Sequence, residues 1–176
     1  MKQLTTIEPE ESDKKKRWDY PSCYIVPSKV KDGDILGPKL RKADLDEIQA
    51  ALSSDPVEVL KESIRLSKPG YTIKDSKSKK PLACFGVSSY ELNTGVIWFL
   101  SSEAMFKKNR IQFIKNSKIW VEKLFRDYEI LWNVVDSRNK IHIRWLKWMG
   151  FRFIADIPEY GAEKRMFHQF VRYKYD

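Results

Sequence analysis

The sequence predicts one α/β domain built on a mixed β-sheet, and three observations support that class. Short β-rich runs alternate with amphipathic helical runs along the chain. The pattern of residues 130–151 predicts a strand, a turn and a short helix capped by Asn139. Gly150, in the left-handed backbone conformation, is expected to end this helix. The chain has 176 residues, 42% of them hydrophobic, which is enough to bury a core without disulfides or metals.

The first half of this domain is expected to hold one strand and two helices. Residues 24–27 form the strand, and residues 31–34 belong to the loop that ends it. Residues 43–52 carry apolar side chains at helical spacing and acidic side chains early, which favours a helix. Asp55 followed by Pro56 is typical of the start of a second helix, which a Pro-Gly pair further along the chain ends.

The second half is expected to hold the rest of the sheet and two more helices. Three strands in hairpin arrangement are predicted at residues 71–74, 82–87 and 95–100, with turns at 75–80 and 91–94. A long helix at about 109–128, a strand at 130–135, a helix at 140–149 and two strands at 151–154 and 165–171 follow. The prediction is therefore a central mixed sheet flanked by about four helices.

Residues 1–21 differ from the rest of the chain in composition. They carry five positive and five negative side chains and few apolar ones. Such a segment does not bury enough apolar surface to order itself, so we expect a flexible or partner-ordered arm. Trp18 and Tyr20 are its predicted anchors on a partner, and residues 22–176 are predicted to be the single folded domain.

The cysteines and the hydropathy exclude two classes of protein. Cys23 and Cys84 lie in apolar, strand-like contexts without the spacing of a metal or redox motif, so we expect buried thiols and no metal site. No uncharged apolar run approaches the roughly 20 residues that span a bilayer, so no membrane span is expected.

The net charge of +9 is unevenly distributed. Residues 103–152 hold 12 Lys and Arg against 5 Asp and Glu, a net of +7. A basic face of this kind attracts polyanions, which could be nucleic acid, an acidic protein surface or the phosphates of coenzyme A. The alternative is a solvated helix face without a ligand.

The spacing from Asn139 to the pair Gly150-Phe151 resembles the fourth-helix segment of the GCN5-related N-acetyltransferase (GNAT) superfamily, where an Asn opens the helix and a Gly-Phe pair closes it. The predicted element order over residues 24–173 is also similar to that of GNAT proteins. The resemblance implies a GNAT-like fold. It also implies an acetyl-CoA site in which the pyrophosphate lies on the N-terminus of the long helix, cradled by a glycine-containing loop.

Two positions depart from the pattern that this resemblance implies. The loop expected at residues 101–110 contains no glycine, and its Glu103 would repel phosphate. The position where the family carries a Tyr that protonates the leaving thiolate is Leu146, which has no proton to give. If a cofactor binds, its candidate ligands are Lys107, Lys108, Arg110 and Asn139.

A narrower resemblance lies within residues 81–154. Two segments resemble the GNAT-like internal virion or core-assembly proteins of short-tailed, autographivirus-type phages. These segments are Leu-Trp-Asn-Val-Val at 131–135 and His-Ile-Arg-Trp-Leu-Lys at 142–147. The strand and polar loop at 98–102 fit the same pattern. This resemblance implies a role in virion assembly or genome ejection.

Few residues carry recognisable catalytic chemistry. Glu91 and Asp136 are candidate general bases, although single carboxylates near turns are commonly solvated. His142 is a candidate base or proton relay, with a packed or surface histidine as the alternative. Asn133, inside a predicted buried strand, must find hydrogen-bond partners.

We therefore expect a virion-associated phage protein with a degenerate GNAT fold that acts as a structural or interaction protein, without a cofactor. Its expected partners are portal, core or tail proteins, and its expected locations are the host cytoplasm during assembly and the virion. An acetyl-CoA-dependent N-acetyltransferase and a basic nucleic-acid-binding module, with DNA as its candidate ligand, are the alternatives, and the glycine-free loop and Leu146 count against the enzyme.

Overall fold

The computed structural model describes residues 22–175. The predicted arm, with Trp18 and Tyr20, lies outside the described residues. The strands are β1 (Cys23–Pro27), β2 (Ser67–Asp75), β3 (Pro81–Glu91), β4 (Thr94–Ser101), β5 (Ile130–Asp136), β6 (Arg152–Tyr160) and β7 (Arg165–Tyr173). The helices are α1 (Val30–Leu36), the short 3-10 helix η2 (Gly37–Lys39), α2 (Lys42–Leu52), α3 (Pro56–Leu66), α4 (Glu103–Leu124) and α5 (Lys140–Trp148).

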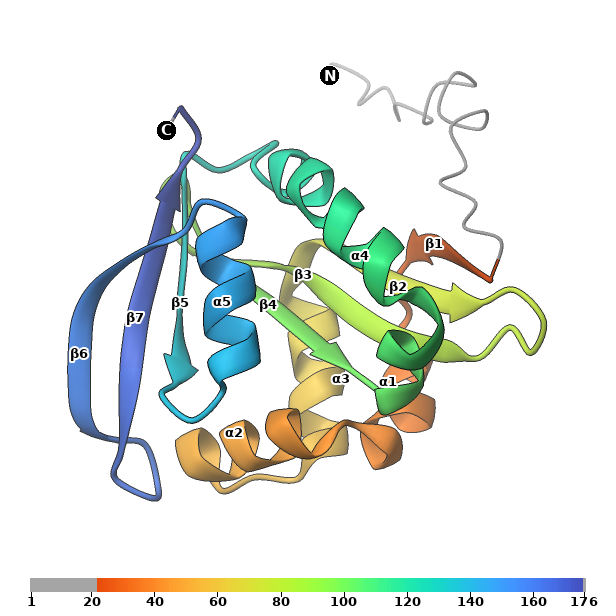
Figure 1. Ribbon diagram of the computed structural model, residues 1–176, viewed down its shortest axis with the longest axis horizontal. Helices are drawn as coiled ribbons and strands as arrows, with labels where there is room; N and C mark the ends of the chain where they lie inside the picture. The colour runs from red at the N-terminus through yellow and green to blue at the C-terminus, as the bar shows by residue number, and fades with distance from the viewer. Residues whose placement is uncertain (1–21, 176) are drawn as a thin grey trace, which may run out of the picture.

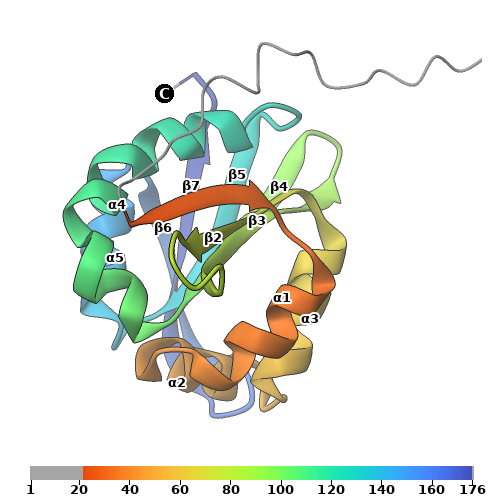
Figure 2. The ribbon, with the colours of Figure 1, turned by 90° about the vertical axis from the view of Figure 1, so that its right-hand side faces the viewer.

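The seven strands form one sheet in the order β1-β2-β3-β4-β5-β7-β6 (Figure 1). Neighbouring strands are antiparallel except β4 and β5, which are parallel, so the predicted mixed sheet is confirmed. Helices α4 and α5 cover one face of the sheet, and α1 and α3 cover the other (Figure 2). None of the described helices is both long and apolar enough to cross a membrane.

Alternation along the strands creates a separate core on each face. In β4, Ile97 and Phe99 pack with the core under α4 and α5, whereas Trp98 and Leu100 pack with the core under α1, α2 and α3. Both cysteines are buried, as predicted, and burial raises the pKa of the Cys84 thiol to about 12.

The local signals for several elements are confirmed. Asp55 caps α3 by accepting hydrogen bonds from the backbone N–H groups of Val57 and Glu58, with Pro56 in the first turn. Asn139 caps α5 through the backbone N–H of His142, at 3.3 Å.

Helix α1 corrects the prediction of a loop at residues 31–34 and brings the number of α-helices among the described residues to five, rather than about four. Its Asp32 is only 1% exposed and accepts hydrogen bonds from Thr72 Oγ1 and Lys74 Nζ in β2. Gly33 lies so close to α3 that a Cβ would be 2.6 Å from Lys61 Cγ. Asp32 also accepts a hydrogen bond from the backbone N–H of Lys29, so a local capping contact and partners from distant elements together stabilise this helix.

Helix α4 starts earlier than predicted. We expected it to begin near residue 109 after a loop, but Ser102 is its N-cap and the helix begins at Glu103. Only Ser102 separates β4 from α4. The loop expected at residues 101–110 is therefore absent, and most of those residues form the first turns of the helix.

Candidate functional site

The candidate site lies where β4 and β5 separate. The two parallel strands pair only through Thr94–Val96 and Ile130–Trp132 and then diverge. At the point of divergence, Asn133 Nδ2 donates to the carbonyl oxygen of Ile97 at 2.7 Å, and its Oδ1 accepts from the Val134 N–H. Asn133 thus finds the partners that a polar group in a strand needs and bridges the opening.

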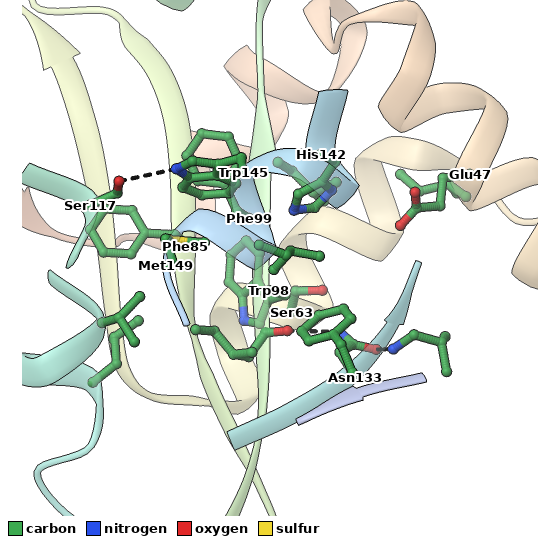
Figure 3. Close-up of a pocket in the computed structure, with 18 of the residues that line it drawn as sticks. Glu47, Ser63, Phe85, Trp98, Phe99, Ser117, Asn133, His142, Trp145 and Met149 are labelled. Carbon is green, nitrogen blue, oxygen red and sulfur yellow. Dashed lines mark hydrogen bonds between the residues drawn. The ribbon is translucent and has the colours of Figure 1, made fainter. Parts of the chain in front are cut away.

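A cavity of about 270 Å³ lies at this opening (Figure 3). Its walls include Phe85 and Phe99 from one face of the sheet and Ile48 and Trp98 from the other. Because both faces contribute, the cavity extends through the gap between β4 and β5. Most of its lining is apolar or aromatic, which is usual for a small-molecule site.

Glu47 is the acidic side chain of this cavity. It comes from α2, and its Oε2 accepts from Asn139 Nδ2 at 3.2 Å and from the backbone N–H of Asp136 at 3.4 Å. Burial raises the pKa of Glu47 to about 7, and the carboxylates of Asp44 and Asp136 act in the same direction. A carboxyl with this pKa exchanges a proton near neutral pH.

His142 lies in the wall between this cavity and a second one. Its Nδ1 is buried without a hydrogen-bond partner in the described structure, and its ring packs on Trp145 with centroids 5.4 Å apart. Burial lowers the pKa of His142 to about 3, and the charge of Arg41 acts in the same direction. The imidazole is therefore neutral at physiological pH and does not serve as a cationic ligand.

The N-terminus of α4, where the GNAT resemblance would place a pyrophosphate, is packed against the segment before α2. Leu40 forms an isolated antiparallel bridge with Ser102. The Arg41 N–H donates to the Ser101 carbonyl at 2.9 Å, and Asp44 Oδ2 accepts from the Ser101 N–H at 2.9 Å. The junction between β4 and α4 is thus covered by protein groups.

The electrostatics of this junction do not favour a polyanion. The Arg41 guanidinium is paired with Asp44 at 2.7 Å and lies over the Phe106 ring at 5.2 Å. Burial raises the pKa of Asp44, although Arg41 opposes the shift, and Glu103 adds a second carboxylate nearby. A pyrophosphate would have to break the Arg41–Asp44 pair and approach acidic groups without a glycine cradle, so these residues do not fit coenzyme A.

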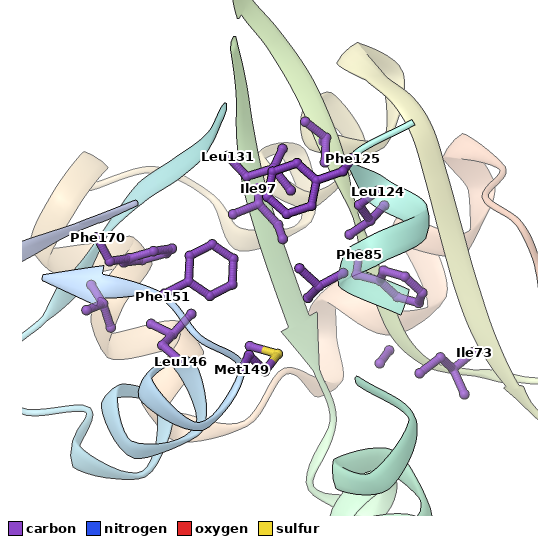
Figure 4. Packing of buried hydrophobic residues seen from close by; sticks show 14 of the residues in the cluster. Ile73, Phe85, Ile97, Leu124, Phe125, Leu131, Leu146, Met149, Phe151 and Phe170 are labelled. Carbon is purple, nitrogen blue, oxygen red and sulfur yellow. The ribbon is translucent and has the colours of Figure 1, made fainter. Parts of the chain in front are cut away.

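Leu146 occupies a core position. It is 3% exposed and lies in the cluster with Met149, Phe151 and Phe170 (Figure 4). This position therefore contributes packing, and it offers no group that could protonate a leaving thiolate.

The candidate catalytic residues are only partly brought together. Asp136 and His142 lie close to Glu47 and the capping Asn139, but Glu91 pairs with Thr94 at the opposite end of β4 from Ser101. Burial acts to raise the pKa of Asp136, yet hydrogen bonds from Arg138 hold it below its usual value. Asp136 is therefore an ionised partner of Arg138 and a poor proton acceptor.

The candidate cofactor ligands lie on different parts of the α4–α5 side. Lys107 and Arg110 project from the first turns of α4 as exposed residues, and Arg110 lines the second cavity. Lys108 lies in the same helix, but its side chain is outside what the structure describes. Asn139 is 8% exposed and is engaged by Glu47 and by the first turn of α5.

Sequence reasoning missed Glu47, Arg41 and Asp44. All three belong to, or directly precede, a helix whose sequence is that of an ordinary amphipathic segment. Their contacts in the site are with residues 57 to 92 positions away along the chain, so no local pattern identifies them.

Comparison with known proteins adds two findings. The family described as "Bacteriophage T7, probable scaffold protein Gp13" matches residues 82–157. Among curated proteins, no sequence matches the chain.

Solved structures of acetyltransferases share the fold. The ribosomal-protein-S5-alanine acetyltransferase from Vibrio fischeri aligns with a TM-score of 0.66 at 11% identity, covering 91% of this chain and 97% of that one. Ard1 from Thermoplasma volcanium gives 0.64 at 15% identity, covering 86% and 97%. A GNAT-family acetyltransferase from Bacillus anthracis gives 0.64 at 11% identity, covering 88% and 96%. The chain therefore has the fold of the GNAT acetyltransferases, and its central part, residues 82–157, is similar to the family of the bacteriophage T7 probable scaffold protein Gp13.

Proposed function

We propose that this protein is a structural or interaction component of phage particles, acting in virion assembly or genome ejection on a GNAT fold that no longer binds acetyl-CoA well. The match of residues 82–157 to a probable scaffold protein family supports the phage role. Other virion proteins, of the portal, core or tail, are the proposed partners. The host cytoplasm during assembly and the virion are the proposed locations.

The observation that carries this proposal is the closed junction between β4 and α4. Ser101 and Ser102 are bonded to Leu82, Arg41 and Asp44, and α4 begins without a loop. A helix N-terminus binds phosphate when its free N–H groups and a close backbone are accessible, and here the backbone just before the helix, at Ser101 and Ser102, is bonded to protein groups instead. Buried Leu146 supports the same conclusion for proton transfer.

Calorimetric titration with acetyl-CoA tests the loss of cofactor binding. We expect a dissociation constant on the order of a millimolar or weaker, equivalent to about 4 kcal/mol of binding. A GNAT acetyltransferase titrated in parallel is the positive control. An affinity in the low micromolar range for this chain would overturn the proposal.

Particle composition tests the assembly role. Phage that lack the gene are grown with and without complementation in trans, and the purified particles are compared by quantitative mass spectrometry. We expect the protein in complemented particles at a fixed ratio to a capsid or portal subunit, and defective assembly or DNA delivery without it. Normal particles and normal infection after deletion would contradict the role.

Acetyl transfer is the second candidate, and one observation favours it. The cavity at the split between β4 and β5 contains Glu47, whose pKa of about 7 suits a general base. If the titration gives micromolar affinity, an acetylation assay with Glu47→Gln would test this role. Loss of turnover with unchanged acetyl-CoA affinity would support Glu47 as the base.

A further inference from the structure

A second cavity, also of about 270 Å³, lies between α4 and α5. Phe106 and Phe113 from α4, Trp145 and Trp148 from α5, and Phe99 from β4 contribute aromatic walls. Aliphatic side chains stand beside these rings, and among them Ile141 is 64% exposed. We call this feature the α4–α5 cleft.

Three arginines line the α4–α5 cleft, and they are not equivalent. Arg41 is 8% exposed and already paired with Asp44. Arg110 and Arg144 are exposed, and neither has an ion-pair partner among residues 22–175. The cleft therefore combines two unpaired guanidinium groups with an apolar centre, a composition enriched at the energetic centres of protein interfaces.

The aromatic rings of the cleft are not arranged as a stacking platform for nucleic-acid bases. Lys118 Nζ lies over the Trp148 ring at 4.5 Å, and Arg41 lies over Phe106 at 5.2 Å. Phe113 packs against Trp145 with centroids 5.0 Å apart. Bases stack on open ring faces, and here Arg41, Lys118 and Trp145 each contact one of these rings. The observations favour a protein ligand over single-stranded DNA.

We propose that the α4–α5 cleft binds an acidic segment of a partner protein, whose carboxylates pair with Arg110 and Arg144 and whose apolar side chain enters the cavity. Bidentate pairing of guanidinium with carboxylate supplies orientation, and a cavity of this size accommodates one large side chain. This inference rests on the proposed function for the view that the partner is a protein, and it specifies that partner's chemistry.

The test uses the full chain and a fluorescein-labelled peptide of Glu and Leu residues, with binding followed by fluorescence anisotropy. Arg110→Glu combined with Arg144→Glu should weaken binding at least about tenfold, since two charge-assisted contacts become repulsive. Lys107→Glu combined with Lys115→Glu is the matched control on α4, with the same charge change outside the cleft lining, and should change binding less than about twofold.

A second pair of variants tests the apolar part of the cleft. Ile141→Ser should weaken binding several-fold, whereas Ile154→Ser, at a 57% exposed position on β6, should not. Both positions are exposed, so both variants should retain the thermal unfolding midpoint of the wild type.

Three outcomes would overturn the inference. The first is no binding of the peptide by the wild-type chain, and the second is equal loss in the two double variants, which would indicate attraction by net charge alone. The third is that the wild-type chain binds a single-stranded oligonucleotide more tightly than the peptide, and that the Arg110→Glu and Arg144→Glu double variant loses this oligonucleotide binding. The peptide is titrated without cofactor, so a micromolar affinity for acetyl-CoA would contradict the proposed function without changing this result.

Discussion

Replacing Glu47 by Gln should remove the contribution of this carboxyl to the pH dependence of the protein's stability. The wild-type carboxyl has a pKa of about 7 in the folded protein and near 4.5 in the unfolded chain. Between these values the unfolded chain has released the proton and the folded protein still holds it. The free energy of unfolding therefore falls as the pH rises from about 4.5 to about 7, and this loss persists above pH 7.

The magnitude follows from the shift. A tenfold change in a proton-binding constant corresponds to about 1.4 kcal/mol, so the rise of the pKa of Glu47 from 4.5 to about 7 corresponds to about 3 kcal/mol. The substituted glutamine would keep a carbonyl oxygen to accept from Asn139 Nδ2 and the Asp136 N–H, but it carries no charge to bury. We therefore expect the free energy of unfolding of Glu47→Gln, relative to that of the wild type, to rise by up to about 3 kcal/mol from acid to alkaline conditions.

Urea denaturation of both proteins at about pH 5 and about pH 8 measures this difference. Asp44 and Asp136 also contribute to the pH dependence, but they are present in both proteins, so their contribution largely cancels in the comparison. Glu129→Gln, at an exposed position, is the control and should show no such change. If the difference between Glu47→Gln and wild type is the same at both pH values, the carboxyl is not buried as the structure places it.

Two further changes test a buried group at the site and the packing at the other end of β4. His142→Phe should make the protein less sensitive to acid, because the buried imidazole has a pKa of about 3. The wild type therefore loses about 1.4 kcal/mol of unfolding free energy for each pH unit as the pH falls below about 6.5. Acid titration followed by tryptophan fluorescence measures this, and identical acid midpoints in the two proteins would contradict it. Gly95→Ala should destabilise the protein by about 1 to 3 kcal/mol in thermal or urea unfolding. The new Cβ would lie 2.2 Å from Val87 Cγ1 and 2.9 Å from Tyr128. Unchanged stability would mean that β4 can shift away from these groups.

The sequence determined those features whose causes lie within a few residues. Asp55 caps α3 and Asn139 caps α5, because a side-chain cap bonds N–H groups two or three positions ahead. Gly150 ends the α5 segment with φ at +91°, in the region that favours glycine. Leu146 was likewise identifiable as a residue without a proton to give. These local signals were enough for the order of the strands and of every described α-helix except α1, and the GNAT fold was expected from the resemblance.

Only the tertiary structure decided what the candidate site contains. Helix α1 forms where a loop was expected, since Asp32 finds Thr72 and Lys74 about 40 positions away. Glu47 acquires its pKa of about 7 from burial and from the carboxylates of Asp44 and Asp136. Asp44 is a neighbour within α2, whereas the burial and Asp136 depend on distant elements of the chain. A carboxyl's pKa depends on solvent and charge in its final environment, and chain neighbours supply only part of that environment.

At the junction between β4 and α4, too, the sequence decided some features and the tertiary structure decided others. The sequence revealed that residues 101–110 lack glycine, but it did not reveal that Arg41 and Asp44 would bond the backbone of Ser101, just before the helix, from 57 or more positions away. Absence of a residue type can be read directly from a sequence. Occupation of a space by another segment depends on how the chain packs, and it is this packing that covers the junction between β4 and α4.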